Sequence, residues 1–234
     1  MKTKILTFLA AAFLLAGCHK EIKLEVKRMH EMDKNNLVAF TIDRPLFSTT
    51  EPAVEESCVV FNDSITKFID LQKNEVRAQA KEFKMAMDSL GEQMVGPFEL
   101  IVKDSVYMAD EDYISVRLLT YAFTGGAHGM TNFYAFNYNV KTKKFLNNSE
   151  ILNYNKIPQI NDLLKAHLQN PDSCFTDTPT AENFTALNFA RHSVDFTYAQ
   201  YILGPYSCGY TTIAIPSHKM KELMSIDVDA AVKN

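Results

Sequence analysis

Residues 113–140 read YISVRLLTYAFTGGAHGMTNFYAFNYNV, two runs rich in aromatic and β-branched residues joined by the glycine-dense TGGAHG. Neither run contains proline, and glycine is confined to the connection, which is typical of a long antiparallel strand pair. Gly125, Gly126 and Gly129 lie close together, and glycine adopts positive φ or admits a neighbouring backbone without steric penalty. The stretch therefore predicts a β-hairpin with a shaped turn.

A long amphipathic helix is expected before this hairpin. Asn62, Asp63 or Ser64 provides a candidate N-cap, and Gly96-Pro97 ends the helix. Apolar residues recur at intervals of three and four on a surface otherwise rich in Lys, Glu, Gln and Arg. These residues are Val76, Ala80, Phe83, Met87, Leu90 and Met94.

The remaining segments complete a mixed fold. Most of the expected strands pair with sequence neighbours, while helices come early, in the middle and late in the chain. We therefore predict an α+β fold, with an antiparallel sheet, the long amphipathic helix packed on it and one or two shorter helices. The expected strands are 37–42, 98–109, 113–123, 130–140, 183–190, 194–203 and 211–216, with a turn near 110–112, and the shorter helices are 157–168 and 217–224.

The N-terminus has the features of an export signal. Lys2 and Lys4 precede the apolar run ILTFLAAAFLL, which is shorter than the roughly 20 residues that a membrane span needs. Residues 15–18 read LAGC, which is similar to the lipobox of bacterial lipoproteins. That resemblance implies that Cys18 becomes the lipidated first residue of a protein anchored in the cell envelope, outside the cytoplasm on a periplasmic or surface face. The alternative is an ordinary signal peptide.

We expect three parts along the chain. Residues 1–17 are the signal peptide, and residues 18–36 are the lipidated cysteine and a charged tether with almost no aromatic residues. Residues 37–234 are one domain, with an N-terminal part at 37–110 and a C-terminal part at 111–226. A chain that is 47% hydrophobic can form one sizeable core, so no cofactor is expected.

The charge balance bears on partners. Loss of residues 1–17 removes two lysines and no acids, which changes the formal charge from -4 to -6. Because no basic patch with interleaved aromatic residues is present, we do not expect nucleic acid as a partner. A basic protein partner is compatible with this charge.

No metal site is predicted. Asp110, Glu111 and Asp112 are contiguous, without the alternating ligands and glycine of a calcium loop, so a solvated turn is favoured. The methionines of the long helix stand at core spacing without cysteine or histidine, which favours core packing over a soft-metal site. They are Met85, Met87 and Met94.

The cysteines allow one bridge. If Cys18 is lipidated, Cys58, Cys174 and Cys208 remain, which permits one disulfide and one free thiol in an oxidising compartment. A Cys174–Cys208 bridge is favoured because both residues lie in loop-like segments. The alternative is no bridge.

Four common catalytic motifs are absent from the sequence. Gly-x-Ser-x-Gly, His-Glu-x-x-His, the P-loop and Cys-x-x-Cys are all missing, so we expect no enzyme. The alternative is a cell-envelope hydrolase with Cys208 as nucleophile and His128 as base, which requires that the two side chains be adjacent. A carboxylate pair of Glu99 and Asp104 is a further alternative.

The hairpin also carries a family resemblance. YAFTGGAHGMTNFYAFNYNVKTKKFL and VDFTYAQYILGPYSCGYTTIAIPSHKMKELM resemble an extracellular domain family found in the lysozyme-sensing anti-sigma factor RsiV and in the N-terminal region of the peptidoglycan deacetylase PdaC. The resemblance covers roughly residues 37–224, and GGAHG is its most specific part. The catalytic polysaccharide-deacetylase motifs of PdaC are absent.

The resemblance implies a non-catalytic binding module for a lysozyme-like protein or for peptidoglycan. Tyrosine offers flat apolar area with a polar handle, which suits both kinds of ligand. The alternative for each tyrosine is a place in the core or on the sheet face, and for His128 a hydrogen bond to local backbone. The expected ligand-binding residues are Tyr121, Thr124, Gly125, Gly126, His128, Tyr201, Tyr206 and Gly209.

Overall fold

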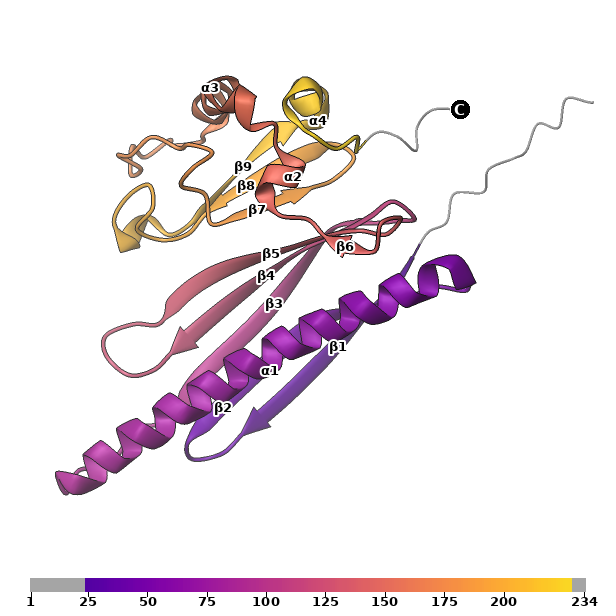
Figure 1. Cartoon of the computed structure of the whole chain (residues 1–234). Helices are drawn as coiled ribbons and strands as arrows, with labels where there is room; N and C mark the ends of the chain where they lie inside the picture. The colour runs from indigo at the N-terminus through magenta and orange to yellow at the C-terminus, as the bar shows by residue number, and fades with distance from the viewer. Residues whose placement is uncertain (1–23, 229–234) are drawn as a thin grey trace, which may run out of the picture.

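The computed structural model describes residues 24–228 (Figure 1). The expected signal peptide and Cys18 lie outside these described residues. None of the helices within 24–228 is long and apolar enough to cross a membrane.

The larger sheet has six strands in the order β1-β2-β3-β4-β5-β6. Neighbouring strands are antiparallel except for the parallel pair β2 and β3, which the helix α1 connects as a crossover. The bounds are β1 Glu25–Lys34, β2 Val38–Ser48, α1 Pro52–Ser89, β3 Phe98–Ala109, β4 Tyr113–Phe123, β5 Met130–Asn139 and β6 Lys144–Phe145.

The smaller sheet has three antiparallel strands, β7-β8-β9. Short helices cover its outer face, with α3 and α4 packed on β9 (Figure 1). The α+β fold with a long helix on a largely antiparallel sheet is therefore confirmed. The bounds are α2 Asn148–Ile151, η1 Tyr154–Lys156, α3 Ile157–His167, β7 Ala186–Phe189, β8 Ser193–Tyr198, η2 Tyr206–Cys208, β9 Thr211–Pro216, α4 Ser217–Met220 and η3 Lys221–Leu223.

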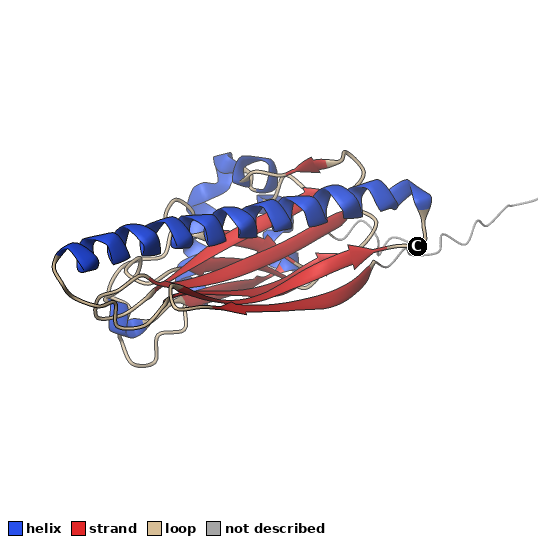
Figure 2. Cartoon of the chain, turned by 90° about the horizontal axis from the view of Figure 1, so that it is seen from below, coloured by secondary structure: helices blue, strands red, loops and turns tan. Residues whose placement is uncertain are grey.

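The larger sheet lies between α1 and the smaller sheet. Alternate residues of a strand point to opposite faces. In β4, Ile114, Val116 and Leu118 join the core beneath α1, while Ser115 and Arg117 contact the smaller sheet. Figure 2 shows α1 lying along the strands of the larger sheet. The chain thus has two cores that share one sheet.

A β-bulge lets β3 contribute to both cores. The register with β4 shifts between Val106 and Met108, which leaves Tyr107 as the extra residue. Before the bulge, Leu100 packs in the core beneath α1. After it, Met108 packs in the core of the smaller sheet.

The predicted hairpin is confirmed. β4 and β5 pair from Tyr113↔Asn139 to Ala122↔Met130, which leaves residues 124–129 as the turn. Gly125 and Gly126 have φ of 92° and 93°, values that L side chains rarely adopt.

The structure differs from the expected tether before residue 37. Glu25–Lys34 forms β1, an exposed edge strand paired with β2 along its whole length. Its side chains form ion pairs instead of an apolar face: Glu31 with Lys73 of α1, and Arg28 with Asp104 of β3. Edge strands commonly carry charged side chains. This strand accordingly lacks the alternation of apolar and polar residues by which a strand is recognised in a sequence.

The long helix also begins earlier than its expected cap. α1 starts at Pro52, a residue well suited to the first helical position. Asn62 lies inside the helix, where its side chain accepts from the backbone N–H of Phe47 (2.9 Å) and donates to the carbonyl of the same residue (2.8 Å). The apolar stripe is buried only as far as Ala80, and Leu90 is 72% exposed.

A buried polar network joins the two sheets. The Ser115 hydroxyl donates to Asn137 Oδ1 (2.7 Å) and accepts from Asn188 Nδ2 (3.1 Å). Asn137 Nδ2 donates to the carbonyl of Leu187 (2.8 Å). These three side chains are almost fully buried, so their hydrogen bonds fix β7 on β4 and β5.

Arg117 extends this contact toward the next two strands. Its Nη1 donates to the hydroxyls of Thr197 in β8 (2.7 Å) and Thr212 in β9 (2.9 Å). The guanidinium also lies 5.3 Å from the ring centroid of Phe133. Burial raises the pKa of nearby Asp195, which a hydrogen bond from Ser193 and the charge of Arg117 oppose.

Phe61→Ala should test the core beneath α1. Phe61 is fully buried against the rings of Phe47, Tyr138 and Phe145, so its truncation should lower the free energy of unfolding by about 3–5 kcal/mol. Leu71→Ala on the same helix, at a position that is 66% exposed, should change it by no more than about 0.5 kcal/mol. Chemical denaturation measures both variants, and similar losses in the two would contradict this packing.

Candidate functional site

The hairpin turn lies at the end of the larger sheet far from the point where the described chain begins. Glu25, the first residue of β1, pairs with Ser48, whereas Phe123, next to the turn, pairs with Glu99 near the start of β3. Since β3 runs parallel to β2, these contacts mark opposite ends of the strands. Ten residues at roughly 3.3 Å each separate the ends by about 33 Å. We call the end with residues 124–129 the distal end.

Four rings gather at this distal end, and we call them the aromatic cluster: Tyr121, His128, Tyr201 and Tyr206. His128 stacks on Tyr206 with 3.9 Å between ring centroids and 22° between planes. Tyr201 lies 5.6 Å from Tyr206 at 43°. The structure therefore brings together predicted residues from the hairpin turn and from the segment 199–210.

The carbonyl of Gly129 holds the stack in place. It accepts a hydrogen bond from the Tyr206 hydroxyl (3.0 Å), and His128 Nδ1 lies 3.1 Å from the same oxygen. The local hydrogen bond considered for His128 is thus present, yet the ring stays exposed. Tyr206 is half-buried and Tyr201 is 56% exposed.

Gly129 is required by packing. Of the three glycines in the hairpin turn, Gly125 and Gly126 have positive φ and Gly129 does not. A Cβ on Gly129 would lie 2.6 Å from the hydroxyl oxygen of Tyr121, so any larger residue would have to displace that ring. This close approach places Tyr121 beneath the turn.

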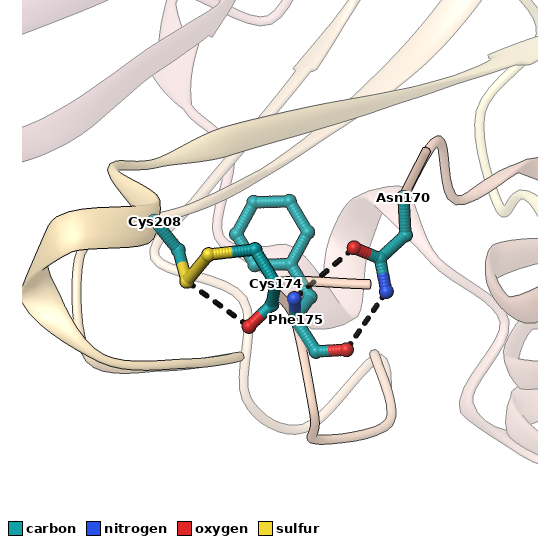
Figure 3. The surroundings of a disulfide bond; sticks show 4 residues. All are labelled: Asn170, Cys174, Phe175 and Cys208. Atoms are coloured by element: carbon teal, nitrogen blue, oxygen red, sulfur yellow. Dashed lines mark hydrogen bonds between the residues drawn. A yellow bond between two sulfur atoms is a disulfide. The ribbon is translucent and has the colours of Figure 1, made fainter. Parts of the chain in front are cut away.

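A disulfide between Cys174 and Cys208, the pairing favoured from the sequence, holds the segment that carries Tyr206 (Figure 3). Asn170 braces the other side, because its side chain bonds both the N–H (3.1 Å) and the carbonyl (2.8 Å) of Phe175. A Cβ on Gly204 would lie 2.8 Å from the carbonyl oxygen of Cys174, so the two segments touch closely. The remaining described cysteine, Cys58, is buried, and burial raises the pKa of its thiol.

The disulfide bears on the hydrolase alternative. Cys208 Sγ is bonded to Cys174 and provides no thiolate for His128 to activate. Sγ lies 3.0 Å from the carbonyl oxygen of Cys174, a contact without a donated proton. The structure also separates the two members of the alternative carboxylate pair. Glu99 and Asp104 are five residues apart on a regular part of β3, so their side chains point to opposite faces of the sheet.

The other half of the turn faces α1. The Cβ position of Gly125 is 3.8 Å from Phe98 and 3.9 Å from Phe83, and Thr124 lines a pocket with the same two rings. Gly126 lines a neighbouring apolar pocket. The predicted ligand-binding residues therefore divide between two surfaces, one on each side of the turn. Gly209 lies near the aromatic cluster, with a φ of 72° and its N–H donating to the carbonyl of Tyr206.

Several residues at the distal end were not singled out from the sequence. Gln200 Oε1 accepts from the N–H of Thr131 (3.3 Å) and so ties the two loops together. Gly204 stands before Pro205, a pair that signals a turn but not its contact with Cys174. Phe83 and Met87 belong to the apolar stripe that predicted core packing for the long helix. Only the structure shows that the last buried residue of this helix is Ala80, so the stripe beyond it does not reach the core.

The acidic turn is accounted for by internal contacts. Asp110 Oδ1 accepts from the N–H groups of Asp112 and Tyr113, and its Oδ2 accepts from Arg191 (2.9 Å). Asp112 forms an ion pair with Lys141. Within residues 24–228, no group of three or more His, Cys, Asp or Glu side chains is arranged to hold a metal ion.

Gly129→Ala should disturb the aromatic cluster. The added methyl group must displace the Tyr121 ring, so the free energy of unfolding should fall by about 1–3 kcal/mol. Thr124→Ala, at an exposed position of the same turn, should change it by no more than about 0.5 kcal/mol. Denaturant unfolding compares the two variants, and equal stability would show that Tyr121 does not restrict this position.

Comparison with known proteins gives a family match. The family model "Deacetylase PdaC" matches residues 31–131, which include β2, α1, β3, β4 and the hairpin turn. No curated protein matches the chain.

Solved structures with the same fold include two bacterial proteins. One is a DUF3298 family member from Bacteroides fragilis, with a TM-score of 0.66 and 15% identity over 92% of this chain and 98% of that chain. The other is a DUF3298 family protein from Pseudomonas aeruginosa, with a TM-score of 0.55 and 17% identity over 89% of this chain and 96% of that chain. Residues 31–131 are therefore PdaC-like, and the chain has the fold of the DUF3298 family structures.

Proposed function

We propose that this protein is a non-catalytic binding module of the cell envelope, anchored by lipid at Cys18, and that its aromatic cluster binds wall glycan. The observation that carries the proposal is the exposure of His128 and Tyr201 on a backbone held by a disulfide and a glycine turn. Because the backbone of the aromatic cluster is already held in place, little conformational entropy is lost when a ligand binds.

The chemistry of the cluster suits a sugar. Pyranose rings have apolar C–H faces that lie flat on aromatic rings and hydroxyl groups that need hydrogen-bond partners. The outer ring of Tyr201 and the exposed ring of His128 offer such faces, while the Tyr206 hydroxyl is used internally.

The position of the cluster suits an anchored protein. Leu24 is six residues after Cys18, so an extended connection would reach at most about 21 Å. The cluster lies at the distal end, about 33 Å along the strands from the start of β1. A lipid at Cys18 would therefore leave the cluster directed away from the membrane.

The family match fits a non-catalytic role. The name of the matched family refers to a deacetylase, and the resemblance of this chain is to the accessory N-terminal region of that enzyme. A second candidate ligand is a lysozyme-like protein, which the formal charge of -6 after loss of residues 1–17 favours, because such proteins are basic.

Substitutions in the cluster should weaken glycan binding. Purified residues 19–234 should cosediment with peptidoglycan sacculi, and His128→Ala or Tyr201→Ala should each reduce affinity by about two- to tenfold through loss of ring contact. Tyr154→Ala, at a tyrosine 51% exposed outside the cluster, is the matched control and should bind like the wild type.

Three results would contradict this proposal. They are no cosedimentation, equal binding by the cluster variants and the control, and turnover of muropeptides by the wild-type protein. A thermal shift with lysozyme but none with sacculi fragments would favour the second ligand.

Cys18→Ser should abolish the anchor. Without the thiol there is no acceptor for lipid, so the variant should lose labelling by radioactive palmitate and leave the membrane fraction. The wild-type chain should be labelled and membrane-bound, and a Cys18→Ser variant that keeps both properties would refute anchoring at this residue.

A further inference from the structure

The tip of α1 forms an apolar pocket on the opposite side of the turn from the aromatic cluster. Ala80 is the last buried residue of the helix, which nevertheless continues to Ser89. Beyond Ala80 the helix and the following loop present apolar side chains to solvent, including Val95, which is 99% exposed. The pocket, which we call the tip pocket, is lined by Phe83, Met87, Met94, Val95, Gly96, Phe98, Phe123, Gly125 and Gly126.

The size and lining of the tip pocket suit a large apolar side chain. Its volume is about 320 Å³, at the lower end of the range of ligand sites. Gly125 and Gly126 form one wall without side chains, and nothing lies within 4 Å of the Cβ position of Gly126. A sugar needs several polar side chains, whereas the polar groups here are those of the backbone alone.

A carboxylate beside the tip pocket favours a ligand that carries positive charge. No charged side chain lines the tip pocket itself. Glu82 lines the adjoining pocket with Gln79 and Thr124. Lys84, on the same helix, forms an ion pair with Asp88, with 2.6 Å between Nζ and Oδ2. Glu82 forms no ion pair among residues 24–228. Glu82 is thus placed to receive a cation next to an apolar group.

We propose that the tip pocket docks a polypeptide partner through an apolar side chain with a basic residue beside it. An apolar anchor in a pocket with charge at the rim is the usual arrangement of a protein-binding hot spot. The Phe, Met and Val lining supplies the apolar contact and the Glu82 carboxylate supplies the complementary charge. This surface is separate from the aromatic cluster, so the proposal does not depend on glycan binding.

The test uses residues 19–234 carrying ¹³C-methyl methionine and the peptide acetyl-Lys-Phe-Lys-amide as probe. Met87 and Met94 line the tip pocket, whereas Met85 lies on the same helix outside it. Titration should shift the methyl signals of Met87 and Met94 with a dissociation constant on the order of 1 mM and leave that of Met85 in place. Acetyl-Lys-Ser-Lys-amide should cause no comparable shift.

Variants separate the apolar and charged contributions. Val95→Lys places a cation in the mouth of the tip pocket and should weaken binding by about tenfold, without loss of thermal stability because Val95 is exposed. Met85→Lys, at a site 72% exposed, makes the same charge change outside the pocket and is the matched control. Glu82→Gln should weaken binding by about threefold.

The outcomes are distinguishable. Unshifted Met87 and Met94 signals, or equal shifts with acetyl-Glu-Phe-Glu-amide, would overturn the proposal. Shifts of the same methyl groups on raising the protein concentration alone would assign the pocket to a second copy of this chain, which also overturns it. His128→Ala should bind the peptide normally, so failure here leaves glycan binding by the aromatic cluster untouched.

Discussion

The buried hydrogen bonds between the two sheets are the constraint on which the rest of this structure depends. Ser115, Asn137 and Asn188 lie where an apolar contact would be expected, and each needs its partner because an unpaired buried polar group costs about 1–3 kcal/mol. An apolar interface could slide, but the directional hydrogen bonds of these side chains hold one register. The smaller sheet is therefore seated on β4 and β5 in a single position.

That position is what assembles the distal end. The segment 199–210 follows β8, so its rings reach the hairpin turn only if β8 is placed correctly, as the bonds from Arg117 to Thr197 and Thr212 require. The disulfide and Asn170 then fix the segment from its other side. Residues far apart in sequence meet because both sheets and one covalent bond determine their places.

Local patterns predicted the hairpin, the α+β class, and the Cys174–Cys208 pairing. They missed β1, because an edge strand held by ion pairs has no apolar period, and they misplaced the start of α1, because Asn62 bonds a distant backbone instead of capping a helix. The candidate binding residues lie on two surfaces, one on each side of the turn. Which side of the turn each residue faces depends on how far α1 extends past the sheet, and that is a tertiary property.

The pairing of β1 with β2 has a mechanical consequence. A load applied between Leu24 and a ligand held at the distal end would act along the strands, since β1 begins at one end of the sheet and the turn lies at the other. The force would then load the hydrogen bonds of all ten paired residues of β1 in shear, and these bonds would not break one after another from one end. Such a geometry resists removal of β1 from the edge of the sheet under that load.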